Sequence, residues 1–229
     1  MEILGVRVDN LSMNEVLEKI RGFLNDGRQH QIVTVNPEFI VKAQKDEEFK
    51  KILNEADLAI PDGTGLLWAS RMLGESLKER VAGVDLISVI MNQESGIKSK
   101  VFLLGGRNRI AEKIAMQWAA VIGFTEDIEI TVSSVNGCQP DILLVALGAP
   151  KQEKWIAENL KKVASVKLAI GVGGAFDMIS GRIRRSPRLM QKIGLEWFWR
   201  LILQPWRVSR IFNAVIVFPW LVLKSKIKL

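Results

Sequence analysis

ADLAIPDGTGLLWASRM, residues 56–72, is the stretch of the chain that decides its fold. Residues 57–60, three of which are apolar, predict a short buried strand. The Pro-Asp-Gly-Thr-Gly turn of residues 61–65 ends it, and the pattern that follows predicts a helix to residue 72. The same order of strand, turn and helix recurs along the chain. Further strands are predicted at residues 3–8, 30–35, 100–104, 128–132, 141–147 and 167–172.

Short runs rich in Val, Ile and Leu that alternate with helices are typical of a parallel sheet covered by helices on both faces. The sequence therefore predicts an α/β protein with a doubly wound, mostly parallel sheet. Residues 12–15 have capping-box spacing before a helix to about residue 25. Asn36 and Pro37 start a helical pattern that continues to about residue 56.

One connection does not fit this order. Only eight residues, 133–140, separate the strands predicted at 128–132 and 141–147. A parallel crossover needs about a dozen residues and usually contains a helix. Either these strands are not parallel neighbours, or a helix common to this architecture is missing, and the sequence leaves both possibilities open.

The composition suits one α/β domain or one domain with an appendage, because 48% of the 229 residues are hydrophobic. A single Cys and a single His exclude an internal disulfide and a His/Cys zinc cluster. The N-terminus lacks the pattern of a secretory signal, so we expect a cytoplasmic protein. We expect residues 1–181 to form the sheet domain and residues 182–229 a C-terminal helical appendage.

The appendage differs from the rest of the chain in charge. Residues 182–229 contain eleven Lys or Arg and one acid, Glu196, so their net charge is +10 and that of the other residues is −3. Four of the seven Trp residues also fall in this segment. Its longest apolar run, residues 211–223, is interrupted by Asn213 and Pro219 and is shorter than the roughly 20 residues that span a bilayer.

Basic residues interleaved with Trp and aliphatic residues suit a surface that is both anionic and apolar, such as a phospholipid headgroup layer. We therefore expect a basic amphipathic appendage that binds a membrane surface peripherally. One alternative is a set of helices packed on the sheet domain with solvated cations. Contact with nucleic acid is disfavoured, because nucleic-acid-binding tails pair cations with Gly, Ser or isolated aromatic residues.

Ligands of open parallel sheets bind beyond the carboxyl ends of the strands, so polar residues at those positions are the candidates for chemistry. Asp62 follows an apolar strand and precedes Gly-Thr-Gly. It is either a catalytic carboxylate or the N-cap of the next helix. Thr34 is compatible with a site but also with ordinary strand propensity, and Asn36 is adequately explained as a helix cap.

Two further strand ends offer groups that could bind phosphate. Gly105 and Gly106 follow a buried strand, where they either admit a diphosphate close to a helix N-terminus or form a tight turn. Lys151 and Gln152 begin a helix after the strand at 141–147, either as ligands or as surface residues.

Several common catalytic motifs are absent from the sequence. It has no Asp-x-Asp pair to hold a diphosphate-bound metal, no Gly-x-Ser-x-Gly turn and no Walker lysine loop. Charge on a phosphorylated substrate must then be stabilised by Arg, Lys and backbone amides. Arg80 either binds phosphate with its two-pronged guanidinium or pairs with Glu79.

The motifs together resemble a known family. In chain order and over nearly the whole chain they are TVNPEFIVKAQKD (34–46), ADLAIPDGTGLLWAS (56–70), ERVAGVDL (79–86), VFLLGG (101–106), VALGAPKQEKWI (145–156), GVGGAFDMISGRIRRSP (171–187) and GLEWFWRLILQPWR (194–207). This series resembles the WecG/TagA/CpsF glycosyltransferase family, and within it the TagA branch.

The resemblance implies a Rossmann-like fold and a bacterial, inverting glycosyltransferase without cofactor or metal, bound peripherally to the inner face of the cell membrane. In the TagA branch the donor is UDP-N-acetylmannosamine and the acceptor is undecaprenyl-diphosphate N-acetylglucosamine. The β-1,4-linked product starts the linkage unit of wall teichoic acid. The oligomeric state is not implied.

By the same resemblance, Asp62 matches the general base and Thr34 an active-site threonine, while Asn36, Arg80 and Gln152 line the same pocket. The appendage arginines thought to close over the donor diphosphate match Arg200, Arg207 and Arg210. Inverting transfer needs a base for the acceptor hydroxyl and cations for the leaving UDP, and guanidinium groups suit phosphate oxygens. Pro205 can start a second helix between Arg200 and Arg207.

Two other functions stay open. The same fold and acceptor type could use another donor, such as UDP-N-acetylmannosaminuronic acid or UDP-glucose, because no residue pattern identifies the sugar. A non-enzyme alternative is a basic nucleotide- or nucleic-acid-binding module. The resemblance also has a gap, because the helix that the family has between the strands predicted at 128–132 and 141–147 is expected to be absent here.

Overall fold

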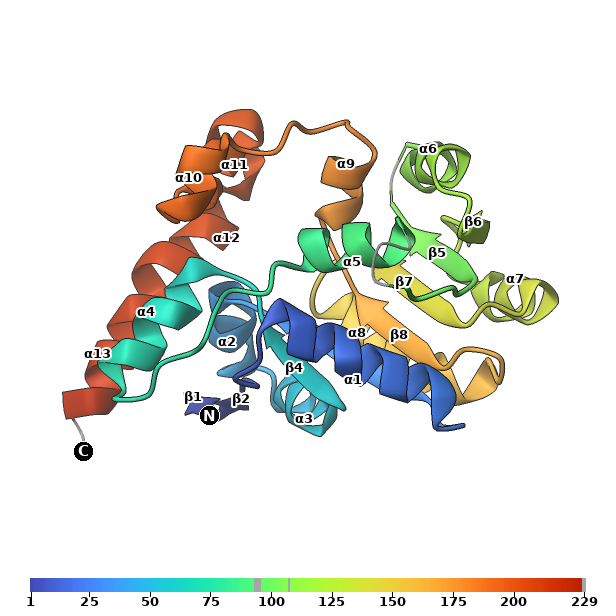
Figure 1. Cartoon of the computed structure of the whole chain (residues 1–229). Helices are drawn as coiled ribbons and strands as arrows, with labels where there is room; N and C mark the ends of the chain where they lie inside the picture. The colour runs from blue at the N-terminus through green and yellow to red at the C-terminus, as the bar shows by residue number, and fades with distance from the viewer. Residues whose placement is uncertain (93–95, 107, 228–229) are drawn as a thin grey trace.

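Six parallel strands form the main sheet of the protein (Figure 1). The structure is a computed structural model and describes residues 1–92, 96–106 and 108–227. The strand order is β4-β3-β8-β7-β5-β6, and all the pairs are parallel. The strands are β3 (His30–Val35), β4 (Leu58–Pro61), β5 (Val101–Gly105), β6 (Val121–Thr125), β7 (Ile142–Ala146) and β8 (Leu168–Gly171). The predicted parallel α/β sheet is confirmed.

Helices cover both faces of the sheet because successive strand residues point to opposite sides. Ile32 packs in the cluster on one face and Val33 in the cluster on the other. The first face is covered by α1 (Met13–Asn25), α5 (Gly83–Met91), α6 (Ile110–Gln117) and α9 (Ala175–Ile179). The second is covered by α2 (Pro37–Ala43), α3 (Glu47–Glu55), α7 (Thr131–Cys138) and α8 (Lys151–Asn159), with α4 (Thr64–Met72) beyond the end of β4.

The predicted helix starts are confirmed. The Ser12 hydroxyl accepts a hydrogen bond from the backbone N–H of Glu15, and the Glu15 carboxylate accepts one from the backbone N–H of Ser12, as a capping box requires. Asn36 accepts from the N–H of Phe39 at 3.1 Å and so caps α2. The pattern to residue 56 is two helices rather than one, because Asp46 caps a new helix, α3.

The single N-terminal strand predicted at residues 3–8 is wrong, because the segment forms two short strands. The segment is a small antiparallel hairpin of β1 (Glu2–Ile3) and β2 (Val6–Arg7), separate from the main sheet. The turn residues Leu4 and Gly5 have φ angles of 51° and 79°. Glycine is suited to this left-handed conformation, and the turn reverses the chain.

The strand predicted at residues 128–132 is also wrong, and so is the expectation that no helix connects it to the next strand. The strand of the sheet is β6, Val121–Thr125, and helix α7 at Thr131–Cys138 makes the crossover to β7. β6 is an edge strand with alternating exposed residues, so its apolar signal is weak and merges with the end of α6. The crossover helix of the expected architecture is therefore present.

The C-terminal helices form the orange and red column in Figure 1, and the last of them lies beside α4 and α2. They are α10 (Arg188–Lys192), α11 (Glu196–Leu203), α12 (Val208–Phe212) and α13 (Phe218–Ile227), with a 3₁₀ turn at Pro205–Arg207 and a π-helical turn at Asn213–Val217. The wide π turn precedes Pro219, which lacks the N–H that an α-helix needs there. Asn213 and Pro219 therefore do not break the helix.

The stretch Pro205–Ile227 has 23 residues and is long and apolar enough to cross a membrane. Length and composition are weak evidence by themselves. In this structure Phe218 and Val222 are fully buried in the cluster that contains α2 and α4. One side of the stretch is therefore packed on the sheet domain, as the packed alternative predicts, and the other side is exposed.

Candidate active site

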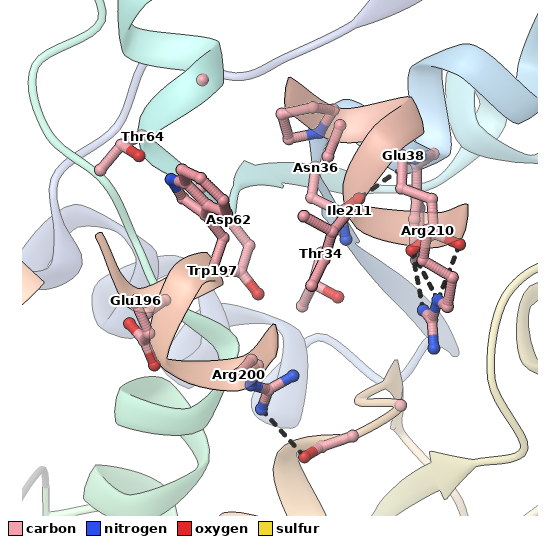
Figure 2. Close-up of a pocket in the computed structure, with 18 of the residues that line it drawn as sticks. Thr34, Asn36, Glu38, Asp62, Thr64, Glu196, Trp197, Arg200, Arg210 and Ile211 are labelled. Atoms are coloured by element: carbon pink, nitrogen blue, oxygen red, sulfur yellow. Dashed lines mark hydrogen bonds and ion pairs between the residues drawn. The ribbon is translucent and has the colours of Figure 1, made fainter. Parts of the chain in front are cut away.

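A pocket of about 380 Å³ lies at the carboxyl ends of β3, β4 and β8 and is closed on one side by the C-terminal helices. Its volume falls in the range of small-molecule sites. Eight of the eleven predicted site residues line it: Thr34, Asn36, Asp62, Arg80, Gln152, Arg200, Arg207 and Arg210. The sheet domain and the C-terminal helices thus contribute to a single site, part of which is drawn in Figure 2.

Asp62 directly follows β4, whose last residue is Pro61. The capping alternative is wrong, because Gly63 is the N-cap of α4 and no side chain caps that helix. Burial raises the pKa of Asp62 to about 6, against the opposing effects of the Arg80 guanidinium and of a hydrogen bond from the backbone of Gly83. A carboxylate with this pKa is mostly ionised near neutral pH and still holds a proton readily.

Thr34 is 5% exposed and donates its hydroxyl hydrogen to the carbonyl of Gly171 at 3.0 Å. This bond fixes the orientation of the Thr34 hydroxyl at the pocket. Gly83 packs between Thr34 and Asp62, because a Cβ on Gly83 would lie 3.2 Å from Thr34 Cγ2 and 3.5 Å from Asp62 Oδ2. The close packing holds Asp62 and Thr34 near each other.

Arg80 does not pair with Glu79, so that alternative is wrong. Its Nη1 lies 3.1 Å from Oε2 of Glu196, and both side chains are largely buried. Glu79 instead accepts a hydrogen bond from the backbone of Met13. Glu196 is the single acid of the C-terminal segment, so its contact with Arg80 ties that segment to the sheet domain.

The three appendage arginines reach the pocket from different elements. α11 ends at Leu203 and a 3₁₀ turn begins at Pro205, so Arg200 and Arg207 do not share one continuous helix. Both guanidinium groups lie against Gly174, where a Cβ would be 2.7 Å from Arg207 Nη2 and 3.4 Å from Arg200 Nη1. The absence of a side chain at Gly174 leaves room for them.

The electrostatic state of these arginines differs. Burial lowers the pKa of Arg200, which donates to the carbonyl of Gly174 at 3.2 Å. Burial, with repulsion from Arg200 and Arg210, lowers the pKa of Arg207 to about 10. Arg210 instead donates from Nε to both oxygens of Glu38 at 2.9 and 2.8 Å. The pocket therefore holds cations whose charge is only partly compensated.

Gln152 lines the pocket but its amide mainly organises two loops. Oε1 accepts from the N–H groups of Gly148 and Gly173, at 3.0 Å each, and Nε2 donates to Oε1 of Glu153 at 2.7 Å. Glu153 is fully buried, and burial raises the pKa of its carboxyl to about 7. This arrangement joins the turns that follow β7 and β8.

Three predicted ligands lie elsewhere. Gly105 and Gly106 are not in the pocket lining, because Gly105 ends β5 and Gly106 follows it, and β7 separates β5 from β8. Gly105 has a φ of +87° and a Cβ there would be 2.9 Å from the carbonyl oxygen of Ala146, so the turn explains this glycine. Lys151 begins α8 with its side chain exposed outside the pocket. A ligand role for these residues stays a prediction.

Sequence reasoning missed several pocket residues, among them Glu38, Glu196 and Trp197. Glu38 sits beside the predicted Asn36, but nothing in its motif distinguishes it from a surface acid at a helix start. Glu196 carried a signal, since it is the one acid in residues 182–229. Figure 2 shows Glu38 facing Arg210, and Trp197 lines the same pocket as Asp62.

Among the described residues, no three His, Cys, Asp or Glu side chains are grouped so that they could hold a metal ion. The groups available at the pocket are one carboxylate of raised pKa, one buried hydroxyl and several guanidinium groups. This set can accept a proton from a hydroxyl and stabilise negative charge on a phosphate.

Comparison with known proteins agrees with this chemistry. The model of the "Glycosyl transferase WecG/TagA/CpsF family" matches residues 1–229. A Bacillus subtilis (strain 168) protein named N-acetylglucosaminyldiphosphoundecaprenol N-acetyl-beta-D-mannosaminyltransferase is 33% identical over 192 residues, 80% of this chain and 75% of the relative. A Staphylococcus aureus (strain MRSA252) protein of the same name is 30% identical over 241 aligned positions, 100% of this chain and 94% of the relative.

Proposed function

The chain belongs to the WecG/TagA/CpsF glycosyltransferase family, and from that premise we propose that it transfers N-acetylmannosamine from UDP-N-acetylmannosamine to undecaprenyl-diphosphate N-acetylglucosamine. The names of the two relatives support this donor sugar and acceptor. The observation that carries the proposal for this chain is the position of Asp62 in a pocket shared with Arg200, Arg207 and Arg210.

In the proposed reaction, Asp62 takes the proton of the acceptor's C4 hydroxyl, and that oxygen attacks the anomeric carbon of the donor sugar. A C–O bond to the acceptor forms as the bond to the UDP diphosphate breaks, with inversion at the anomeric carbon. The electron pair and the negative charge leave on the diphosphate. Guanidinium groups of the C-terminal helices stabilise that charge, and no protein nucleophile is needed.

Mass spectrometry of the product tests the donor. The purified protein is incubated with a short-chain prenyl-diphosphate N-acetylglucosamine and a panel of UDP-sugars. We expect addition of one N-acetylhexosamine from UDP-N-acetylmannosamine and much slower transfer from UDP-N-acetylmannosaminuronic acid or UDP-glucose. Preference for either of those would replace the proposed donor while leaving the family assignment intact. The family match decides against the non-enzyme alternative of a nucleic-acid-binding module.

The rate is expected to depend on pH through Asp62. Only the carboxylate form accepts a proton, and the pKa of Asp62 is raised to about 6. We expect kcat/KM to be constant above this pH and to fall about tenfold per unit below it. Initial rates between pH 4.5 and 8.5, at subsaturating donor, measure this profile. A profile that stays flat down to pH 5 would exclude Asp62 as the base.

We also propose that the protein binds the inner face of the bacterial cell membrane peripherally. Support comes from the C-terminal segment, residues 182–229, which carries thirteen of the nineteen exposed large hydrophobic side chains among the described residues. Exposed cations lie in the same segment, at Arg182, Arg184, Arg188, Lys224 and Lys226. Apolar side chains with nearby cations favour an anionic lipid surface.

The double variant Ile202→Glu, Trp206→Glu is expected to bind vesicles of 30% phosphatidylglycerol about tenfold or more weakly. Both side chains are exposed and apolar, so each replacement removes apolar contact with the lipid and adds a negative charge. Cosedimentation measures the binding. The matched control is Met116→Glu with Ile130→Glu, which places the same charge on exposed apolar residues of α6 and the start of α7. Equal losses in both variants would show a nonspecific charge effect and contradict the proposal.

A further inference from the structure

Glu38 is a buried carboxylate that holds a C-terminal arginine. It lies in the first turn of α2, is 7% exposed and lines the pocket. Both of its oxygens accept from Arg210 Nε, and Oε2 also lies 2.8 Å from Arg210 Nη2. Lys42, one turn further along α2, places Nζ 2.8 Å from Oε1. Two cations therefore compensate the charge of Glu38.

This contact separates Arg210 from the other two appendage arginines. Arg210 directs its guanidinium to Glu38, while Arg200 donates to a neutral carbonyl and to the sulfur of Met178. Within the described ranges, no hydrogen bond or ion pair engages the guanidinium group of Arg207, whose backbone N–H donates to the carbonyl of Gln204. A guanidinium already paired with a carboxylate gains less from a phosphate than one without a partner. Arg200 and Arg207 are thus the cations left for an anionic ligand.

A second ion pair acts in the same way at the other end of the pocket. Arg80 of the sheet domain pairs with Glu196 at the start of α11. Here the sheet domain supplies the cation and the C-terminal helix the carboxylate, the reverse of the Glu38–Arg210 pair. The C-terminal helices are thereby tied to the sheet domain by α12 with α2 and by α11 with the segment before α5. Figure 2 shows Arg210 turned toward Glu38 and Arg200 turned toward the carbonyl of Gly174.

We propose that Glu38 is a positioning residue that fixes α12 over the pocket through Arg210, so that Arg200 and Arg207 face the leaving diphosphate. This inference rests on the proposed function for its kinetic part. Under this proposal, Arg210 belongs to the contact between the sheet domain and α12. Glu38 touches no reacting atom and affects the rate of transfer through the position of α12.

Two substitutions that remove one charge each test it: Glu38→Gln and Arg210→Gln, alone and together. If the pair positions α12, each single variant should lower kcat/KM for UDP-N-acetylmannosamine by about 10- to 100-fold, and the double variant should be no worse than the lower single one. If Arg210 binds the diphosphate and Glu38 only competes for it, Glu38→Gln should lower the KM of the donor. That second result would overturn the proposal.

Hydrogen exchange separates this test from the identity of the donor. In the substrate-free protein, amides of residues 208–217 should exchange about tenfold faster in Glu38→Gln and in Arg210→Gln than in the unchanged protein. The matched controls are Glu158→Gln and Arg188→Gln, at exposed positions on α8 and α10. Unchanged exchange in Glu38→Gln would refute the positioning role, whatever the donor sugar proves to be.

Discussion

The variant Asp62→Asn is expected to transfer sugar about 10³-fold more slowly than the unchanged protein while binding UDP with similar affinity. Asparagine keeps the shape of the side chain but cannot accept the acceptor's proton. UDP affinity should be preserved because the cations proposed to face the diphosphate remain in place. Single-turnover transfer rates and calorimetric titration with UDP measure the two quantities separately.

The control for this variant is Asp57→Asn, which changes a carboxylate just before the amino end of β4, beyond the opposite end of the strand from Asp62. Asp57 contacts His30 there, so its replacement should affect stability and leave the transfer step unchanged. Full transfer by Asp62→Asn would remove the carboxylate from the mechanism. Loss of UDP binding together with transfer would assign Asp62 to the fold of the pocket instead.

The stability of Asp62→Asn provides a further check. Because the pKa of Asp62 is raised from 3.8 to about 6, the folded protein holds a proton that the unfolded chain has lost between these values. Ionisation above pH 6 therefore costs folding free energy, up to about 3 kcal/mol. Asparagine avoids this cost, so the variant should be more stable at pH 8, with the difference shrinking below pH 6. Urea unfolding at pH 8 and pH 5 measures it.

The second large effect is expected at Arg207. Replacing it with Gln should lower kcat/KM about 10²- to 10³-fold, because it removes a cation placed where charge develops on the leaving group. Burial and two neighbouring arginines lower the pKa of Arg207 to about 10, so this cation is poorly compensated before an anion arrives. Steady-state kinetics with varied UDP-sugar, and titration with UDP, measure the loss.

Arg207→Lys should recover part of the activity, because it restores the charge without the two-pronged geometry. Arg184→Gln is the control, since it removes an exposed cation from the same basic segment. If Arg207→Gln keeps full activity while Arg210→Gln loses it, the roles inferred for these two arginines are exchanged.

The sequence predicted those parts of the fold that have strong local signals. Strands β3, β5, β7 and β8 are mostly buried and rich in Val, Ile and Leu, and the caps at Ser12 and Asn36 are local patterns. β6 was misplaced because it is a half-exposed edge strand next to a helix of similar composition. Helix α7 was not predicted because its sequence, TVSSVNGC, is rich in β-branched residues and Ser, which have low helix propensity.

The candidate site divides in the same way. Asp62, Thr34 and Gln152 follow from the rule that ligands bind at the carboxyl ends of parallel strands. The arginines of the appendage were brought to the pocket only by resemblance, because no local pattern tells where a C-terminal helix packs. The Glu38–Arg210 contact joins residues 172 positions apart, so it appears only when the helices are placed in space.

The seating of Phe218 and Val222 among the buried side chains of α2 and α4 limits what can be learned from shortened proteins. A chain cut at residue 181 would lose these two side chains together with the arginines and would leave apolar surface in contact with water. Loss of activity in such a fragment could come from misfolding or from the missing arginines, so it would not identify a catalytic residue. Single substitutions in the intact polypeptide are therefore the informative route to dissecting this half of the molecule.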